Sequence, residues 1–206
     1  RFCRFSGGRG ESRPVNWDRA AEEYLSVARE VLCDLKPAVE ELAVLLADRL
    51  RAGGKVLACG NGGSAADAQH IAAEFINRFE LERPPLPAIA LTTDTSIITC
   101  VGNDYSFDEI FAKQIKALGV EGDVLLAIST SGNSMNVVKA AEAAREQDIY
   151  VCGITGGDGG KLKETADSCL MVESRSTARI QETHILMGHI ICMLVDYILF
   201  QKGIRE

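Results

Sequence analysis

Five short apolar runs alternate with stretches of good helix formers between residues 55 and 200, and this alternation constrains the fold more than any other feature. The runs are predicted strands at residues 55–59, 88–91, 123–128, 149–155 and 168–172. Strands that are apolar throughout and separated by helices are typical of a parallel sheet buried on both faces. Right-handed crossovers then give an α/β fold in three layers, with a doubly wound five-stranded parallel sheet between helices.

Helices are predicted to follow most of the strands, and two more precede the first one. Asn16 is placed to cap a helix over residues 17–36, and Pro37 fits the first turn of a second helix that ends near Arg51. The remaining helices are expected at residues 64–77, 94–101, 108–118, 137–147 and 177–200, with one helical turn at 161–165. Residues 16–206 are therefore predicted to form one domain, and residues 1–15 to be a disordered arm or an expression remnant.

The composition restricts the partners and the compartment. The 206 residues are 47% hydrophobic and carry a formal net charge of −7, a poor electrostatic match for nucleic acid or an anionic membrane. Neither is expected as a partner, and no uninterrupted apolar run reaches the ~18–20 residues that cross a bilayer. The first residues lack the apolar segment of a signal peptide. The seven cysteines stand singly, without a C-x-x-C pair, which favours reduced thiols in the cytoplasm over disulfides or a cysteine zinc site.

A glycine-rich turn, Gly60-Asn61-Gly62-Gly63, separates the first predicted strand from its helix. The N-terminus of a helix offers free N–H groups and partial positive charge, so this turn is a candidate phosphate site. Residues 60–65 also match the dinucleotide pattern G-x-G-x-x-G/A, which expects an acidic residue about 20 positions later. Asp94 comes too late for that role and is placed to cap a helix. A phosphate site, a nicotinamide site and a tight packing turn all remain open, with the nicotinamide site disfavoured.

A second loop, Ser129-Thr130-Ser131-Gly132-Asn133-Ser134, carries four hydroxyls between a buried strand and a helix. Hydroxyls and free N–H groups together suit phosphate oxygens. The loop has no P-loop lysine, which disfavours a nucleoside triphosphate. Ser134 alone is equally consistent with an ordinary helix N-cap.

Two pairs of polar residues on helices are candidates for acid/base chemistry or metal binding. His70 and Glu74 are four positions apart, so they share one face of their helix. Gln181 and His189 are eight positions apart and differ by about 80° around the final helix. His184 points about 140° away from His189 and is the weaker candidate. Each pair is also consistent with an ordinary surface or core role unless the two pairs meet in space.

Taken together and in order, five segments resemble the phosphoheptose isomerases, the sedoheptulose 7-phosphate isomerase branch of the sugar isomerase (SIS) domain family. These segments are residues 60–70, 86–91, 102–104, 129–134 and 178–182. The resemblance spans about residues 16–200. It implies a homotetramer with active sites at subunit contacts. It also implies isomerisation of D-sedoheptulose 7-phosphate to D-glycero-D-manno-heptose 7-phosphate, the first step toward the heptose of bacterial lipopolysaccharide.

The resemblance also implies roles for individual residues. Glu74 and His189 would be the catalytic acid/base pair, and one Zn²⁺ per subunit would be bound by His70, Glu74, Gln181 and His189. Substrate contacts are implied at Asn61, Gly62, Gly63, Glu74, Asn103, Asp104, Ser129, Thr130, Ser131, Ser134 and Gln181. The two roles of Glu74 compete, because a carboxylate bound to a metal is a poorer base.

A neighbouring branch of the same family gives the alternative reading. That branch binds the bacterial replication initiator without known isomerase chemistry, and residues 76–80 and 176–181 share its features. It lacks the acid at position 74 and the imidazole at position 189, and it departs from Gly62-Gly63. This chain has all four residues, so an isomerase is favoured over a non-catalytic protein that binds the initiator or senses a sugar phosphate.

Overall fold

A computed structural model describes residues 16–201 and contains the predicted five-stranded parallel sheet. The strands are β1 (Val56–Cys59), β2 (Ala88–Ala90), β3 (Val124–Ser129), β4 (Tyr150–Gly156) and β5 (Ser168–Val172). They are arranged in the order β2-β1-β3-β4-β5, and every neighbouring pair is parallel. The chain leaves β1 toward β2 on one side and later returns to β3 on the other side. The carboxyl ends of β1 and β3 therefore form the topological switch point, where ligands bind in such sheets.

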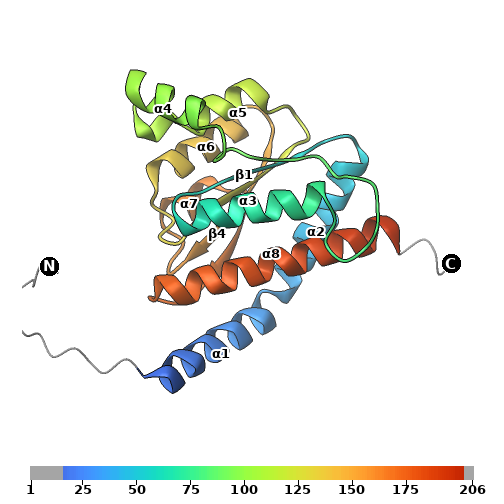
Figure 1. Cartoon of the computed structure of the whole chain (residues 1–206), viewed down its shortest axis with the longest axis vertical. Helices are drawn as coiled ribbons and strands as arrows, with labels where there is room; N and C mark the ends of the chain where they lie inside the picture. The colour runs from blue at the N-terminus through green and yellow to red at the C-terminus, as the bar shows by residue number, and fades with distance from the viewer. Residues whose placement is uncertain (1–15, 202–206) are drawn as a thin grey trace, which may run out of the picture.

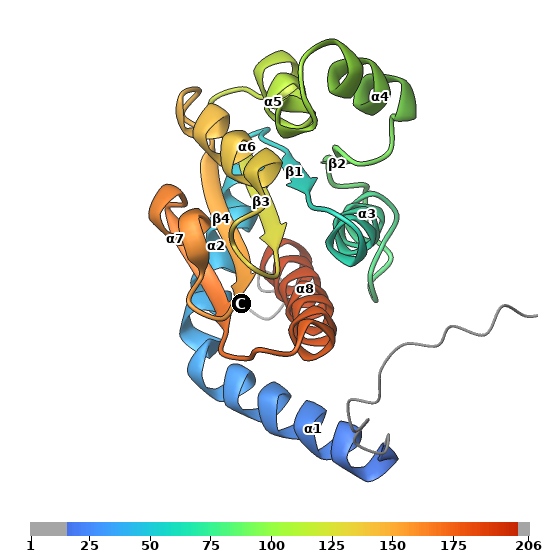
Figure 2. The same ribbon diagram turned by 90° about the vertical axis from the view of Figure 1, so that its left-hand side faces the viewer.

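Helices cover both faces of the sheet, as Figures 1 and 2 show. One face carries α2 (Lys36–Arg51), α3 (Gly63–Ile76) and α8 (Thr177–Phe200), and α1 (Trp17–Asp34) packs on α8 and α2 outside this layer. The other face carries α4 (Thr95–Asp104), the 3-10 helix η1 (Phe107–Glu109), α5 (Ala112–Leu118), α6 (Met135–Arg145) and α7 (Gly160–Thr165). Successive residues of each strand point to opposite faces of the sheet, and each face has its own hydrophobic core. Val56 and Ala58 therefore pack on one face, and Leu57 and Cys59 pack on the other.

The helix boundaries follow local chemistry. The side chain of Asn16 accepts a hydrogen bond from Asp18 N at 3.0 Å, as expected of an N-cap. Asp94 accepts from Ile97 N at 2.9 Å and caps α4. Two predicted boundaries were wrong. Helix α4 continues through Asp104. Gly102 does not end the helix, because it does not adopt the positive φ of a glycine C-cap. The single helix predicted at 108–118 is split into η1 and α5.

Helix α8 has a mean hydropathy of 1.7 over its most apolar 18 residues, so by length and composition it could cross a membrane. The sequence predicted this helix at residues 177–200. Counting uninterrupted apolar runs did not mark it as long and apolar enough to cross a membrane, because polar residues are spaced along it. In the structure, 44% of that window is buried. The helix packs against α2 and α3 (Figure 1), which is the arrangement of a core helix.

Parts of two predictions lie outside the described residues. The arm or remnant expected at residues 1–15 is one, and the last five residues of the predicted domain, 202–206, are the other. Within residues 16–201 the cysteines are all free thiols, in agreement with their scattered spacing.

Candidate active site

The two loops predicted to bind phosphate lie side by side, because β1 and β3 are neighbours in the sheet. Asn61, after β1, and Asn136, in the first turn of α6, form a reciprocal amide pair. Asn61 Nδ2 donates to Asn136 Oδ1 at 2.9 Å, and Asn136 Nδ2 donates to Asn61 Oδ1 at 2.8 Å. Asn136 is buried. This pair ties the turn before α3 to the loop before α6.

The turn after β1 directs the start of α3 toward this edge of the sheet. Gly62 is the N-cap residue of α3, with a positive φ of 55°, a conformation that glycine adopts without strain. The first intrahelical bonds run from Ala65 and Ala66 to Gly62 O, so the N–H groups of Gly63 and Ser64 point out of the helix end. A Cβ at Gly63 would overlap the side-chain amide of Gln181. A glycine at this position therefore lets Gln181, on α8, approach the N-terminus of α3.

The loop after β3 brings hydroxyls and a second helix N-terminus to the same edge. Ser129 Oγ donates to Ser134 Oγ at 3.1 Å, and Ser131 Oγ accepts from Asn133 N at 3.2 Å. Ser134 precedes α6 but makes no side-chain cap bond to it. The carbonyl of Thr130 accepts from Gly156 N at 3.1 Å and joins the loop to β4. Two helix N-termini and four hydroxyls thus line one edge, an arrangement suited to an anion.

A cluster of three metal-ligand side chains lies further along the seam between α3 and α8. His70 Nε2 is 3.1 Å from Glu74 Oε1 and 3.3 Å from His189 Nε2. The three ligand atoms lie within 4.8 Å of one another. The rings of His70 and His189 meet edge to face with centroids 4.9 Å apart, and Phe79 packs beside His189. The sequence predicted each half of this cluster, and the structure brings the two halves together.

The geometry of the cluster fits a divalent metal. Two histidines and one glutamate are the protein ligands of one class of catalytic zinc sites, and zinc bonds of about 2.0–2.1 Å place tetrahedral ligand atoms about 3.3 Å apart. The observed separations of 3.1 and 3.3 Å match this spacing. Without a metal, the Nε2 atom of one imidazole must carry a proton and donate it to the Nε2 atom of the other.

Gln181 lies at the other end of the same seam. Helices α3 and α8 run in the same direction, with Gln181 beside Gly63 and Gly188 beside Ile71. A Cβ at Gly188 would lie 2.9 Å from Ile71 Cδ1, so the glycine allows the helices to approach closely next to His189. Over eight residues an α-helix rises about 12 Å, which separates Gln181 from His189 along α8. The structure groups His70, Glu74 and His189, and it places the side-chain amide of Gln181 beside Gly63 at the start of α3.

Asn103 and Asp104 are the predicted substrate residues that belong to α4. They form the last turn of α4, on the other face of the sheet, and Asn103 Nδ2 donates to Asp104 Oδ1 at 2.8 Å. Both side chains are exposed. Within residues 16–201, no hydrogen bond joins them to the loops or to the histidine cluster.

Two further titratable groups border the site. The Nε2–H of His184 donates to Thr155 O at 2.9 Å, and burial lowers the pKa of His184, so it is a neutral core histidine, as its position on the helix predicted. Asp67 occupies the same face of α3 as His70 and Glu74. Its Oδ2 is buried and finds no hydrogen-bond partner in the described part of the chain. Burial raises the pKa of Asp67 to about 6, although the nearby His70 lowers it in part.

Comparison of this chain with known protein families identifies the class to which this fold and site belong. A family model of the SIS domain matches residues 21–156, so the chain is a SIS-domain protein. The phosphoheptose isomerase of Nitratidesulfovibrio vulgaris (strain Hildenborough) is 54% identical over 188 residues, covering 91% of this chain and 87% of the relative. That of Shewanella loihica is 59% identical over 171 residues, covering 82% and 87%. The chain therefore belongs to the phosphoheptose isomerase family, and the resemblance seen in the sequence is confirmed.

A solved structure supports the same assignment. The structure of phosphoheptose isomerase GmhA from Neisseria gonorrhoeae matches with a TM-score of 0.82 and 48% identity, over 87% of this chain and 97% of that one. The predicted SIS fold with N-terminal helices is thereby confirmed.

Proposed function

We propose that this chain isomerises D-sedoheptulose 7-phosphate to D-glycero-D-manno-heptose 7-phosphate, with Glu74 and His189 as the acid/base pair. Membership of the phosphoheptose isomerase family supports the reaction class. The observation that carries the site assignment is the convergence of α3 and α8 at His70 Nε2, which lies 3.1 Å from Glu74 Oε1 and 3.3 Å from His189 Nε2. A carboxylate and an imidazole thus flank one small volume.

The proposed reaction moves one proton between neighbouring carbons while two oxygens exchange roles. Glu74 removes a proton from C1 of the ketose, and the electrons form the C1–C2 double bond of an enediol as the C2 oxygen takes a proton from His189. The return step takes a proton from the C1 oxygen to His189 and delivers one from Glu74 to C2. Each positioned proton transfer typically contributes 10²–10⁴-fold to the rate. The atoms balance without an external oxidant or reductant.

The phosphate end of the substrate is assigned to the loop after β3. Ser129, Thr130, Ser131 and Ser134 supply hydroxyls, and the N-termini of α3 and α6 supply N–H groups and partial positive charge. The sugar hydroxyls are assigned to Asn61, Gly62, Gly63, Gln181, Asn103 and Asp104. Asn103 and Asp104 are the members of this set that lie on the other face of the sheet.

A zinc ion is proposed for the cluster of His70, Glu74 and His189, with Gln181 as the fourth ligand. When bound, zinc would polarise the carbonyl oxygen and stabilise the charge that develops on it. The ring contact of Phe79 and the helix seam hold His189 in place for that ion. Gln181, whose side-chain amide lies beside Gly63 at the start of the same helix seam, completes the proposed ligand set.

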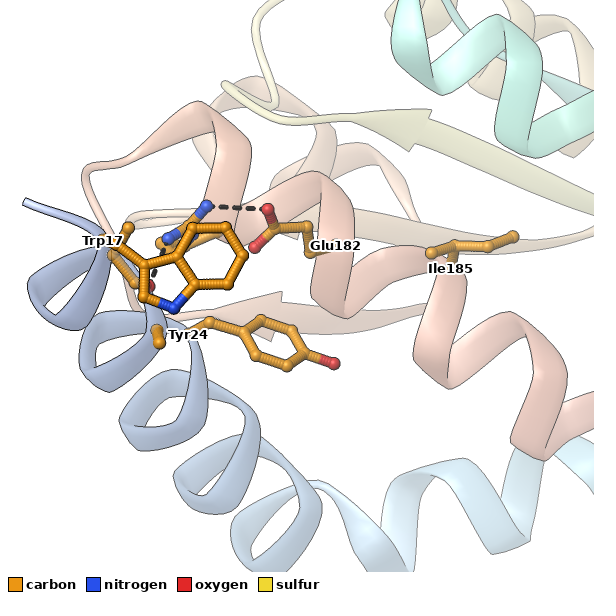
Figure 3. Close-up of a pocket in the computed structure, with 7 residues that line it drawn as sticks. Trp17, Tyr24, Glu182 and Ile185 are labelled. Atoms are coloured by element: carbon orange, nitrogen blue, oxygen red, sulfur yellow. Dashed lines mark hydrogen bonds and ion pairs between the residues drawn. The ribbon is translucent and has the colours of Figure 1, made fainter. Parts of the chain in front are cut away.

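A homotetramer in the cytoplasm completes the proposal. Helix α1 projects from the α/β body (Figure 2), with Trp17 84% and Leu25 62% exposed. Figure 3 shows Trp17 and Tyr24 of α1 around a pocket shared with Glu182 and Ile185 of α8. Exposed apolar surface of this kind marks interaction sites. Light scattering of the purified chain should give about four times its mass of 22.2 kDa, and a monomer would contradict this part.

An isomerase assay tests the function directly. The purified chain is incubated with sedoheptulose 7-phosphate and aldose formation is followed. The wild type should turn over, Glu74→Gln should not, and the control Glu142→Gln, on the exposed face of α6, should match the wild type. Absence of turnover in the zinc-loaded wild type would overturn the proposal and favour a non-catalytic sugar-phosphate sensor.

A further inference from the structure

A buried ion pair joins the two helices that carry the proposed acid/base pair. Arg83 lies in the segment between α3 and β2, which runs past α8 in Figure 1. Its Nε donates to Asp196 Oδ1 of α8 at 2.9 Å, and the two side chains are only 1% and 4% exposed. Such burial is costly for a charge unless its remaining donors are also used.

The remaining donors of Arg83 bind the end of α3. Nη2 donates to Glu74 O at 2.9 Å, and Nη1 donates to Phe75 O at 2.6 Å and to Pro84 O at 3.2 Å. The last carbonyls of a helix have no intrahelical partner, so the guanidinium satisfies them as a C-terminal cap. One side chain therefore binds the backbone of Glu74 and a carboxylate of α8.

Asp196, which binds Arg83, lies on the same helix as His189. The two residues are seven positions apart, which is nearly two full turns, so both lie on one face of α8. Gly188 brings α3 and α8 close together beside His189, and the Arg83 contact lies further along the same seam. The close packing determines the distance between the helices, and the ion pair resists sliding of one helix along the other.

We propose that Arg83 and Asp196 are positioning residues of the isomerase site, which hold α3 and α8 in the register that places Glu74 and His189 opposite one another. The proposal rests on the function proposed above. Both residues act through Glu74 and His189, because their side chains are buried and bind protein groups.

The chemistry of the pair favours positioning over stability. Replacing a buried ion pair by apolar residues of similar volume is often neutral or stabilising. Here Asp196 Oδ2 is buried and has no hydrogen-bond partner among residues 16–201, and burial raises the pKa of Asp196. An incompletely satisfied pair is a poor source of stability. Three directional hydrogen bonds of Arg83, to Asp196 Oδ1, Glu74 O and Phe75 O, nevertheless connect α8 with the end of α3 and define their register.

The test replaces the pair by apolar residues in the double variant Arg83→Met/Asp196→Leu. We expect a folded protein whose melting temperature stays within a few degrees of the wild type, whose kcat falls by about 10–100-fold and whose KM changes by less than about threefold. The matched control is Lys139→Met/Glu109→Gln, which removes the 2.6 Å pair on the other face of the sheet and should leave kcat unchanged. A folded double variant with wild-type kcat and zinc affinity would overturn the proposal.

Two further measurements keep the test decisive. Zinc affinity, measured by competition with a chromophoric chelator, should fall about 10–100-fold in the double variant, because the ligands sit on both helices. If the wild type has no isomerase activity, the proposed function fails, and zinc affinity alone then decides the positioning role.

If the double variant does not fold, Arg83→Lys replaces it. Lysine keeps the charge without the planar fork, so kcat should fall while folding is retained, and an unchanged kcat would overturn the proposal.

Discussion

The Nε2 atoms of His70 and His189 lie 3.3 Å apart, although 119 positions separate the two residues along the chain. Helix α3 contributes one ring and helix α8 the other, and Glu74 Oε1 lies 3.1 Å from the same Nε2 atom of His70. This convergence turns two separate helical residue pairs into one site. It also makes the properties of the site depend on how closely the two helices pack.

The first prediction concerns the metal. Loss of a hydrogen bond that supports a metal ligand lowers metal affinity by ~10–100-fold. His70→Ala removes a ligand itself, so zinc affinity should fall by more than this. Gln69→Ala, the neighbouring exposed residue on α3, is the control and should bind zinc as the wild type does. Zinc bound to each variant after dialysis, measured by mass spectrometry of the metal, checks this. Wild-type zinc content in His70→Ala would refute the site.

Gln181→Ala tests the fourth ligand separately. If Gln181 binds zinc, the variant should lose zinc affinity as well as substrate affinity. An increase in KM with unchanged zinc affinity would assign Gln181 to the substrate alone, in keeping with its position beside Gly63. Chelator competition and steady-state kinetics on the same preparation separate the two results.

The second prediction concerns the phosphate. Ser131→Ala should raise KM for sedoheptulose 7-phosphate more than it lowers kcat, because the hydroxyl binds the phosphate equally in the ground and transition states. The control is Ser26→Ala, on the exposed face of α1. Steady-state kinetics across substrate concentrations check this, and an unchanged KM in Ser131→Ala would contradict the assignment.

The third prediction concerns the amide pair that joins the two loops. Asn136→Ala leaves the amide of Asn61 without its buried partner, at a cost of about 1–3 kcal/mol of unfolding free energy. Because Asn61 is assigned to the substrate, kcat/KM should fall about tenfold or more as its side chain loses its fixed position. Denaturant unfolding and kinetics measure the two effects. Wild-type kcat/KM in a destabilised Asn136→Ala would mean that the pair only supports the fold.

The fourth prediction concerns Asp67 and pH. Burial raises its pKa to about 6 in the folded chain, above its value of about 3.9 in an unfolded chain. As the pH rises through this window the unfolded state loses its proton first, so Asp67 lowers stability progressively and the effect levels off above pH 6. Asp67→Asn should therefore raise the melting temperature of the metal-free protein more at pH 7.5 than at pH 4.5. An equal gain at both values, or the same pattern in the exposed control Asp34→Asn, would contradict this.

Much of the fold could be predicted because its signals are local. Apolar runs bounded by glycine and serine loops indicate buried strands, and the cap residues Asn16 and Asp94 act as expected. The predicted helix at 108–118 was wrong in part, because the sequence carries no clear stop where η1 ends and α5 begins.

The site was harder to predict where it depends on distant pairs. Each histidine was found from its helical spacing, but their meeting depends on the packing of α3 against α8. Asn136 and its partner Asn61 are 75 positions apart, and Arg83 and Asp196 are 113 positions apart. Both pairs join residues with ordinary local patterns, so only the folded chain identifies them.

Proton exchange at the substrate carbon tests the central claim most directly. In D₂O, the wild type should replace a carbon-bound hydrogen of sedoheptulose 7-phosphate by deuterium as the enediol forms, which proton NMR detects. Glu74→Gln should bind the substrate but show no exchange above the uncatalysed rate, because the base at carbon is gone. Exchange at the wild-type rate in Glu74→Gln would contradict the account, since another group would then be removing the proton.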